Sequence, residues 1–187
     1  MILVYILAGI LGFLIFIVFP WATYNSLAKK KIAIENNASQ IGIQCKKRFD
    51  LVPNLVETVK GYAKHEHDTL QDVIAARNAG ANATNLKDLA AANNQITGAL
   101  GRLFALSESY PDLKANAGFV SLQGELANLE RQIATSRQLF NDSVMIYNRT
   151  VAVFPKNIIA KMFGFKKSEF FATPTEEMQN VKVNFGG

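Results

Sequence analysis

The sequence has little of what most catalytic and metal sites require. It contains one cysteine, Cys45, among 187 residues, which excludes a disulfide within the chain and a metal site built from several of its own thiolates. It has no glycine-rich phosphate loop and no nucleophile elbow, and the sequence suggests no partner that would activate the thiol of Cys45. Basic residues are not interleaved with aromatic ones as in a nucleic-acid platform, so we expect no nucleic-acid partner.

Charge is absent from the start of the chain, since all 20 lysines and arginines and all 15 aspartates and glutamates come after residue 28. Within this stretch, residues 2–19 are Ile, Leu, Val, Phe, Ala, Gly and one Tyr. As a helix they would rise about 27 Å, close to the roughly 30 Å hydrocarbon core of a bilayer. A cleaved secretory signal would have a basic region, a shorter apolar core and small residues at its cleavage site, which are missing or weak here. The run therefore predicts a membrane anchor that is retained.

The residues that follow the run are typical of a membrane interface. Trp21 and Tyr24 carry aromatic rings with polar atoms, and three consecutive lysines follow them, Lys29, Lys30 and Lys31. Basic residues beside an anchor favour the cytoplasmic side of a membrane. We therefore expect the N-terminus to lie outside and the rest of the chain to lie in the cytoplasm.

Helical spacing of apolar residues continues after the anchor. Over residues 24–49, apolar or small side chains recur mostly every three or four positions, so the anchor should run on as a helix. We expect a break at residues 50–53, because Pro53 has no amide hydrogen and its ring opposes the carbonyl four residues back. A second helical pattern covers residues 52–77 and ends in a loop at 78–85 that is rich in Gly, Asn and Ala. Whether Pro53 kinks the helix or reverses the chain stays open at this point.

Two further patterns complete the bundle. A third helix fits residues 86–107 and stops before Tyr110-Pro111. The fourth pattern is the strongest, a heptad-like spacing over residues 119–154. This helix is longer than the third, so its far end should pack on the first helix or on another copy of the chain.

The four patterns together predict an all-α protein, with one N-terminal transmembrane helix followed by an up-and-down four-helix bundle of long heptad-like helices. We expect residues 1–24 to form the anchor and its interfacial belt, and residues 25–155 to form the bundle domain. Residues 156–187 should form a basic amphipathic segment and a flexible C-terminal tail. The lysines and phenylalanines of this segment suit either an anionic lipid surface or a flap packed on the bundle, and the sequence leaves both open.

One short cluster, residues 64–68, carries side chains that can bind metals or transfer protons. The zinc motif H-E-x-x-H needs two histidines four residues apart on one face of a helix. Here His65 and His67 are two residues apart and would point about 200 degrees away from each other. We therefore expect a solvated surface, with no metal, no cofactor and no catalytic residue, in a protein that is not an enzyme.

Several motifs are spread over nearly the whole chain. They are the N-terminal anchor, Tyr24-Asn25, Arg48-Phe49-Asp50-Leu51-Val52-Pro53-Asn54-Leu55-Val56, Val59-Lys60-Gly61-Tyr62-Ala63-Lys64-His65-Glu66, Ala76-Arg77, Glu108-Ser109-Tyr110-Pro111-Asp112-Leu113-Lys114-Ala115 and Tyr147-Asn148. This composite resembles the bacterial LemA family. The resemblance implies a single-pass protein of the bacterial inner membrane, with its N-terminus outside and an α-helical bundle inside, and it supplies no catalytic residue.

The motifs contain residues that we expect to act as joints between helices or as a patch that binds a partner. The set is Asp50, Pro53, Asn54, Lys60, Tyr62, His65, Glu66, Tyr110, Pro111 and Asp112. Those around Pro53 should fix the start of one helix, and those around Pro111 should fix the connection between the third and fourth helices. The polar members of the set, such as Asn54, Lys60, His65 and Glu66, suit a partner-binding patch equally well.

These observations favour a non-enzymatic scaffold that associates with itself at the membrane, because an anchor concentrates chains in two dimensions. Its partners would be the lipid bilayer and further copies of the chain in a homo-oligomer or a larger membrane assembly. The alternative is a cytoplasmic-side adaptor for a membrane enzyme or sensor. An adaptor would use the net charge of +5 and the region 62–67 to bind its partner.

Overall fold

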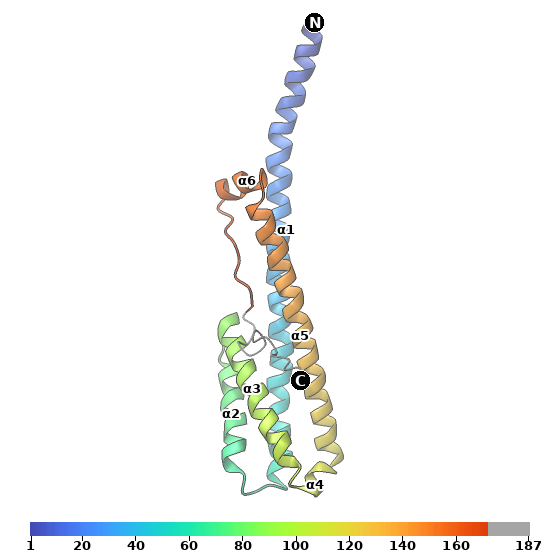
Figure 1. Cartoon of the computed structure of the whole chain (residues 1–187), viewed down its shortest axis with the longest axis vertical. Coiled ribbons are helices and arrows are strands. Elements are labelled where there is room, and N and C mark those ends of the chain that lie inside the picture. The colour runs from blue at the N-terminus through green and yellow to red at the C-terminus, as the bar shows by residue number, and fades with distance from the viewer. Residues whose placement is uncertain (172–187) are drawn as a thin grey trace, which may run out of the picture. The chain divides into compact units, whose positions relative to one another are not determined.

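The computed structural model describes residues 1–171, apart from the side chains of residues 3, 7–12, 14 and 15. Every regular element in this part of the chain is a helix, which confirms the predicted all-α class (Figure 1). The helices are α1 (Ile2–Lys60), α2 (His67–Ala81), α3 (Leu86–Ser107), α4 (Pro111–Lys114), α5 (Ala117–Ala152) and α6 (Lys156–Met162). The predicted flexible tail, residues 173–187, lies outside the described residues.

Among the described residues, no helix combines the length and the hydropathy that crossing a membrane requires. The predicted anchor, residues 2–19, includes nine positions whose side chains lie outside the description. The fold thus gives this part of the prediction no support of its own.

The chain forms two compact units, and α1 and α5 each contribute to both. The first unit contains residues 1–39 and 138–170, and the second contains residues 40–137 with Phe171. The two units are described separately below.

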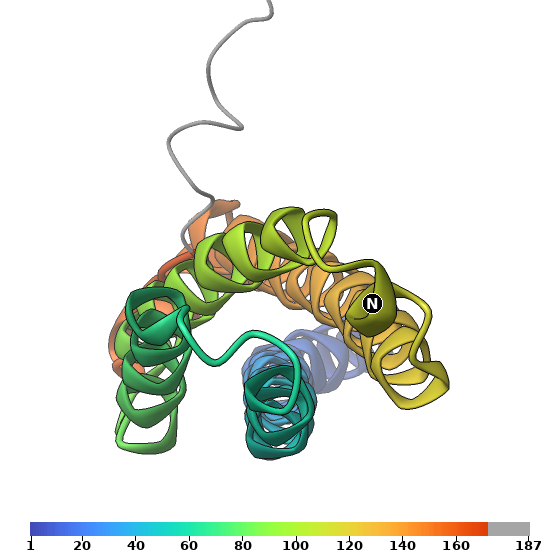
Figure 2. The same ribbon diagram turned by 90° about the horizontal axis from the view of Figure 1, so that it is seen from below.

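Four long helical segments run side by side and in alternating directions in the second unit, as Figures 1 and 2 show. They are the end of α1, then α2, α3 and the beginning of α5. Each contributes an apolar stripe that is almost wholly buried, because amphipathic helices remove these stripes from water only by packing on one another. Members that are at most 2% exposed include Val52, Leu55, Val73, Ile96, Leu103, Phe119, Leu126 and Ile133.

A close approach between α1 and α2 depends on Gly80. A Cβ atom at this position would overlap the phenyl ring of Phe49, and that ring is 3% exposed and has little room to move. Glycine therefore permits the contact that brings the two helices together.

The predicted break at residues 50–53 is wrong, because α1 continues through Pro53 to Lys60. A proline inside a helix costs about 3 kcal/mol, but the apolar stripe stays in register across it. Phe49, Val52 and Val56 are at most 3% exposed, and burying such side chains returns about 1.5–3 kcal/mol each. The chain reverses instead at residues 61–66, so the predicted helix over 52–77 is divided, and α2 extends to Ala81 inside the predicted loop.

The later helices follow the sequence pattern closely. Helix α3 has the predicted bounds, and the side chain of Asn85 caps it by accepting a hydrogen bond from the backbone NH of Asp88 at 2.9 Å. Helix α5 is capped in the same way, since the Asn116 side chain accepts from the NH of Phe119 at 2.9 Å. Such caps satisfy amide groups that lack partners within the helix.

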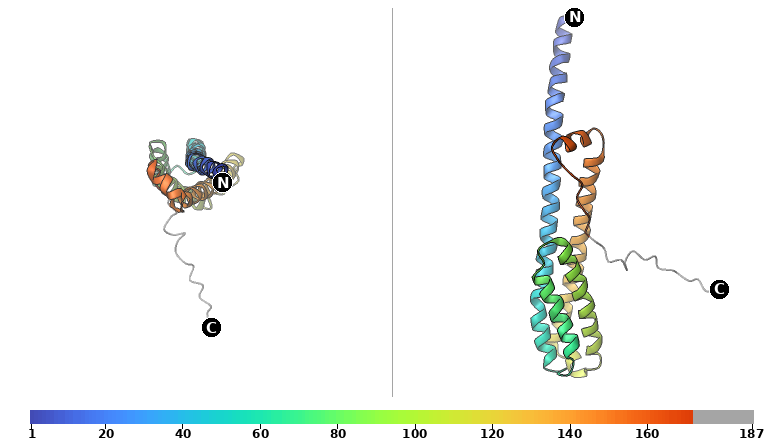
Figure 3. Two further views of the ribbon diagram at one scale, coloured as in Figure 1. Left: turned by 90° about the horizontal axis from the view of Figure 1, so that it is seen from above. Right: turned by 90° about the vertical axis from the view of Figure 1, so that its left-hand side faces the viewer.

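The first unit combines the beginning of α1, the end of α5 and α6. Near its α5 boundary, the Asn37 side-chain amide donates to the carbonyl of Leu139 at 3.2 Å. Helix α6 packs through Ile159 and Ala160, which are buried, and the segment after it returns along α5 (Figure 3). The described lysines of the predicted basic segment lie in this part of the unit together with Phe163, Phe165 and Phe170, whereas Phe171 belongs to the second unit.

Candidate functional site

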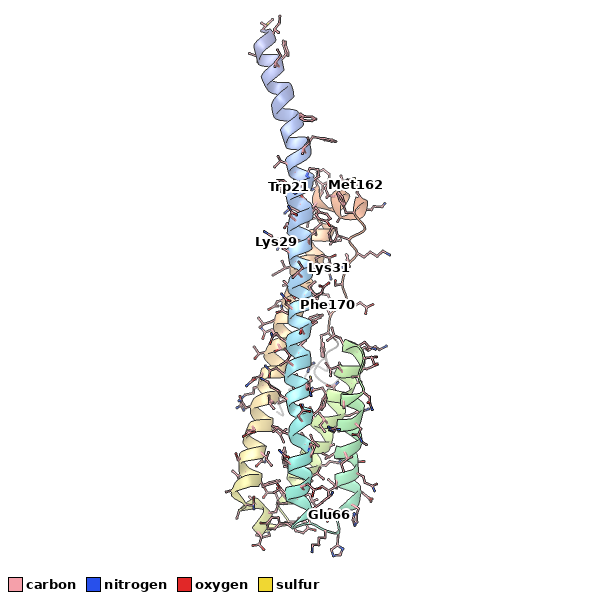
Figure 4. The ribbon with its side chains drawn as sticks, turned by 180° about the vertical axis from the view of Figure 1, so that it is seen from behind. Trp21, Lys29, Lys31, Glu66, Met162 and Phe170 are labelled. Atoms are coloured by element: carbon pink, nitrogen blue, oxygen red, sulfur yellow. The ribbon has the colours of Figure 1, made fainter. Side chains whose placement is uncertain are left out.

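One end of the second unit gathers several of the predicted residues from two loops. Tyr110, before α4, donates a hydrogen bond from its hydroxyl to Glu66 Oε1 at 3.0 Å. Asn116, after α4, donates from Nδ2 to the hydroxyl of Tyr62 at 2.9 Å. Figure 4 labels Glu66 at this end. Two pairs of polar side chains therefore tie the loop before α2 to the connection between α3 and α5.

The polar side chains at this end hold the two loops together, and other side chains of the same loops are exposed. The hydrogen bond to the Glu66 carboxylate raises the pKa of Tyr110, because it stabilises the protonated phenol. Lys64, His65 and His67 point into solvent. Among the described residues, no group of three His, Cys, Asp or Glu side chains is placed to hold a metal ion.

The proposed joint at Asp50, Pro53 and Asn54 is not formed, because all three residues lie within α1. Asp50 pairs with Lys46 at 2.9 Å on the exposed side of the helix. The backbone carbonyl of Asn54 accepts from the Thr58 hydroxyl at 2.8 Å. Their side chains therefore cap no helix start, and the expectation of a joint at this point is corrected.

The other predicted joint residues lie where the chain does turn. Pro111 is the first residue of α4 and Asp112 the second, between α3 and α5. Tyr110 offers no side-chain cap to α4; the capping side chain in this connection belongs to Asn116, which the sequence analysis missed. An asparagine three residues before the first apolar position of a long helix is the signal that could have revealed it. Lys60, at the end of α1, pairs with Glu57 at 2.8 Å.

A buried polar cluster in the interior of the second unit was also missed. The Arg48 side chain is 4% exposed and forms an ion pair with Glu130 of α5. Its Nη1 also donates to Asn93 Oδ1 at 2.9 Å and to Thr97 Oγ1 at 3.0 Å, both on α3. Arg48 thus joins three helices. The sequence carries a signal for Arg48, because this charged residue stands at a position that its spacing along α1 assigns to the apolar stripe.

The electrostatics of this cluster favour a structural role. Burial lowers the pKa of the Arg48 guanidinium, and the Glu130 carboxylate opposes that shift. Burial also raises the pKa of the neighbouring Cys45 thiol to about 11, although Arg48 acts in the other direction. The thiol is therefore protonated at neutral pH and is a weak nucleophile.

The predicted interfacial residues lie in the first unit. The Trp21 side chain is 67% exposed, and the Tyr24 ring contacts the rings of Phe163 and Phe165, with centroids 5.1 and 5.5 Å away. Lys30 donates to the Ser26 hydroxyl at 2.9 Å. Lys29 and Lys31 are exposed, and both are labelled in Figure 4.

A pair of residues on α5 holds the segment after α6 in place. The buried Tyr147 hydroxyl donates to the carbonyl of Lys166 at 2.9 Å. The Asn148 side chain donates to the carbonyl of Ser168 and accepts from its NH, at 2.9 and 2.8 Å. Tyr147-Asn148 was predicted only as part of a motif, and the structure shows that these side chains hold residues 166–168, which follow α6, on α5.

Comparisons with known proteins add three findings. The sequence model of the LemA family matches residues 37–185. Protein LemA of Metamycoplasma hominis is 26% identical, over 86% of this chain and 73% of its own length. Magnetosome protein MamQ of Magnetospirillum gryphiswaldense and Magnetosome protein MamQ 1 of Paramagnetospirillum magneticum are each 24% identical, over 87% of this chain and 70% of theirs.

Proposed function

Because this chain belongs to the LemA family, we propose that it is a single-pass membrane-anchored scaffold that associates with itself and catalyses no reaction. The observation that carries the proposal is an exposed heptad stripe on α5. Leu139 and Ile146 of α5 and Val153, which directly follows the helix, are seven residues apart and are 54%, 52% and 50% exposed. Apolar side chains that recur every seven residues occupy one position of a heptad, and a second copy of the chain is the partner that we propose for them.

The proposed anchor is the uncharged run at residues 2–19, which belongs to the same helix as the core residues of the second unit, α1. A run of this length suits the hydrocarbon thickness of a bilayer. Trp21 and Tyr24 would lie among the headgroups, and Lys29–Lys31 would keep the following residues on the cytoplasmic side. Anchoring holds copies at one surface, which raises their effective concentration and favours contact between their α5 stripes.

The non-enzymatic part of the proposal is supported by what the polar residues do. Arg48 binds both Glu130 and Asn93 in the second unit. Tyr110 and Glu66 bind one another at its end. Groups engaged in this way are used to hold helices and loops together.

Self-association can be tested with a matched pair of variants on α5. Ile146→Lys places a charge on the stripe, whereas Met145→Lys places it on a neighbouring side chain that is 55% exposed and off the stripe. In mild detergent we expect the parent chain and Met145→Lys to form oligomers over micromolar concentrations, and Ile146→Lys to shift toward the monomer. A parent chain that is strictly monomeric over this range would contradict the proposal.

The adaptor alternative is favoured by one observation, the clustering of exposed residues at the end of the second unit. Tyr62 is 43% exposed there, beside the exposed Lys64 and His65. Crosslinking in native membranes separates the two functions. Links only between copies of the chain would disfavour an adaptor, and one abundant foreign protein linked through residues 62–67 would favour it.

A further inference from the structure

We propose that α6 and the residues flanking it form a second membrane contact, which lies in the interface of an anionic lipid leaflet beside the anchor. The proposal rests on the proposed anchor for its location, but its test has a separate readout. It concerns the residues from Phe154 to Phe170, here called the α6 surface.

The outer side of the α6 surface is apolar. Phe154, in the turn before α6, is 74% exposed. Ile158 and Met162 are 57% and 64% exposed, and their spacing of four residues places them on one face of α6. The other face is already occupied, because Ile159 and Ala160 are 8% and 1% exposed. The helix therefore has apolar side chains on both faces, and only the inner ones are covered by described residues.

The α6 surface also carries an excess of positive charge. Residues 153–171 contain four lysines and one acidic residue, Glu169. Lys161, Lys166 and Lys167 are exposed and Lys156 is half-buried. Exposed aromatic and aliphatic side chains flanked by lysines are the composition of segments that lie on anionic membranes. A second protein with an apolar groove would not by itself require this excess of positive charge.

The α6 surface lies close to the end of the proposed anchor. Tyr24 contacts the rings of Phe163 and Phe165 and follows the proposed anchor by five residues, about 7.5 Å of helix. The polar interface of a bilayer extends roughly 5–8 Å beyond the hydrocarbon on each side. The α6 surface thus lies at the depth at which interfacial helices bind. Figure 4 places Met162 close to the level of Trp21 on the first unit.

The end of the α6 surface is already ordered by hydrogen bonds to α5. The hydrogen bonds from Tyr147 and Asn148 to residues 166 and 168 fix the chain after α6 on α5. Little ordering is then needed when the surface meets lipid, which favours binding.

The test uses tryptophan fluorescence in the full chain, with Trp21→Phe as background so that one introduced tryptophan reports. The probe variant is Met162→Trp and the matched control is Met145→Trp, whose methionine on α5 is also exposed, at 55% against 64%. Because Asn37 binds Leu139 across the antiparallel helices, Met145 lies level with about residue 31. That is seven residues, about 10 Å, further from the proposed anchor than Tyr24.

Both variants are placed in lipid nanodiscs of phosphatidylcholine, with and without phosphatidylglycerol, whose acyl chains carry bromine as a quencher. We expect quenching of Met162→Trp to exceed that of Met145→Trp by about twofold or more in the anionic discs. We also expect the excess to shrink in neutral discs and in a Lys161→Gln, Lys166→Gln, Lys167→Gln background. Phe154→Trp, in the turn before α6, serves as a second probe of the α6 surface.

Equal quenching of probe and control in anionic discs would overturn the proposal. A probe that is blue-shifted but not quenched would also overturn it, because another protein copy would then be covering the α6 surface. Trp21 in the unaltered chain reports separately on the anchor. If Trp21 is not quenched, the proposed anchor fails, while the signal from Met162→Trp still decides whether the α6 surface binds lipid.

Discussion

Replacing Arg48 by methionine should destabilise the second unit, because the arginine is the polar centre of three packed helices. Its side chain is 4% exposed, and Nη1 serves Asn93, Thr97 and Glu130 together. Methionine fills most of the volume of the arginine stem but supplies no donor. The change therefore isolates the polar contribution from the packing of the aliphatic part.

The expected loss in the free energy of unfolding follows from the interactions that Asn93 and Glu130 each lose. Asn93 is 2% exposed, and leaving its carbonyl oxygen without the arginine donor should cost about 1–3 kcal/mol. The Glu130 side chain is 36% exposed, so water can solvate its carboxylate, and its loss should fall short of the 3–5 kcal/mol typical of breaking a fully buried pair. We expect a total of about 2–4 kcal/mol.

Urea unfolding followed by circular dichroism measures this change, with Lys46→Met as the matched control. The Lys46 side chain is 76% exposed and pairs with Asp50, and breaking such a surface pair should cost less than about 1 kcal/mol. A double-mutant cycle with Glu130→Met should give a coupling of about 1–3 kcal/mol. If Arg48→Met destabilised the chain no more than Lys46→Met, the inference that this cluster holds the three helices together would be refuted.

Three further outcomes are expected. Gly80→Ala should lower the free energy of unfolding by about 1–2 kcal/mol, because its Cβ would overlap the Phe49 ring. Gly101→Ala, whose Cβ meets open space, should instead raise the free energy of unfolding by up to about 1 kcal/mol. Equal effects of the two changes in urea unfolding would contradict the contact between Gly80 and Phe49. Burial raises the Cys45 pKa from 9.0 to about 11, so its contribution to stability is complete below pH 9 and lost as the pH rises to 11. The stability of the Cys45→Ala variant should therefore fall less over that pH range than the stability of the parent chain. An unchanged dependence of stability on pH would count against a protonated buried thiol. Tyr147→Phe removes the hydroxyl that binds the carbonyl of Lys166, so hydrogen exchange in residues 165–169 should become faster. Unaltered exchange would show that other contacts hold these residues in place.

The helices that the sequence predicted well are those whose ends are set by local chemistry. Helix α3 begins after the capping Asn85 and ends before Tyr110-Pro111, and both signals act within a few residues. Whether the helix continues through Pro53 could not be predicted in this way. The cost of a proline in a helix is local, whereas the burial that offsets it depends on the packing of Phe49 and Val56 against the other helices of the second unit.

The contacts of the buried polar cluster and of the segment after α6 could not be predicted from the sequence for the same reason. Arg48 is marked by its place in the apolar stripe of α1, yet its partners Asn93 and Glu130 lie 45 and 82 positions later in the sequence. The side chains of Tyr147 and Asn148 likewise bind a segment about 20 residues away, through its backbone. Spacing along the chain reveals that such residues are unusual but does not identify what they bind.

Anchoring of the chain with its second unit in the cytoplasm is tested most directly by labelling a new cysteine from outside the cell. Gly124→Cys suits the purpose, since position 124 is exposed on α5 and an added Cβ there meets no atom within 4 Å. The native Cys45 is buried, with a pKa raised to about 11, and should give little background. A thiol reagent that cannot cross membranes should label membrane-bound Gly124→Cys only after bacterial cells are permeabilised. Strong labelling in intact cells, with leakage controlled, would contradict the orientation, and recovery of the chain outside the membrane fraction would contradict the anchor.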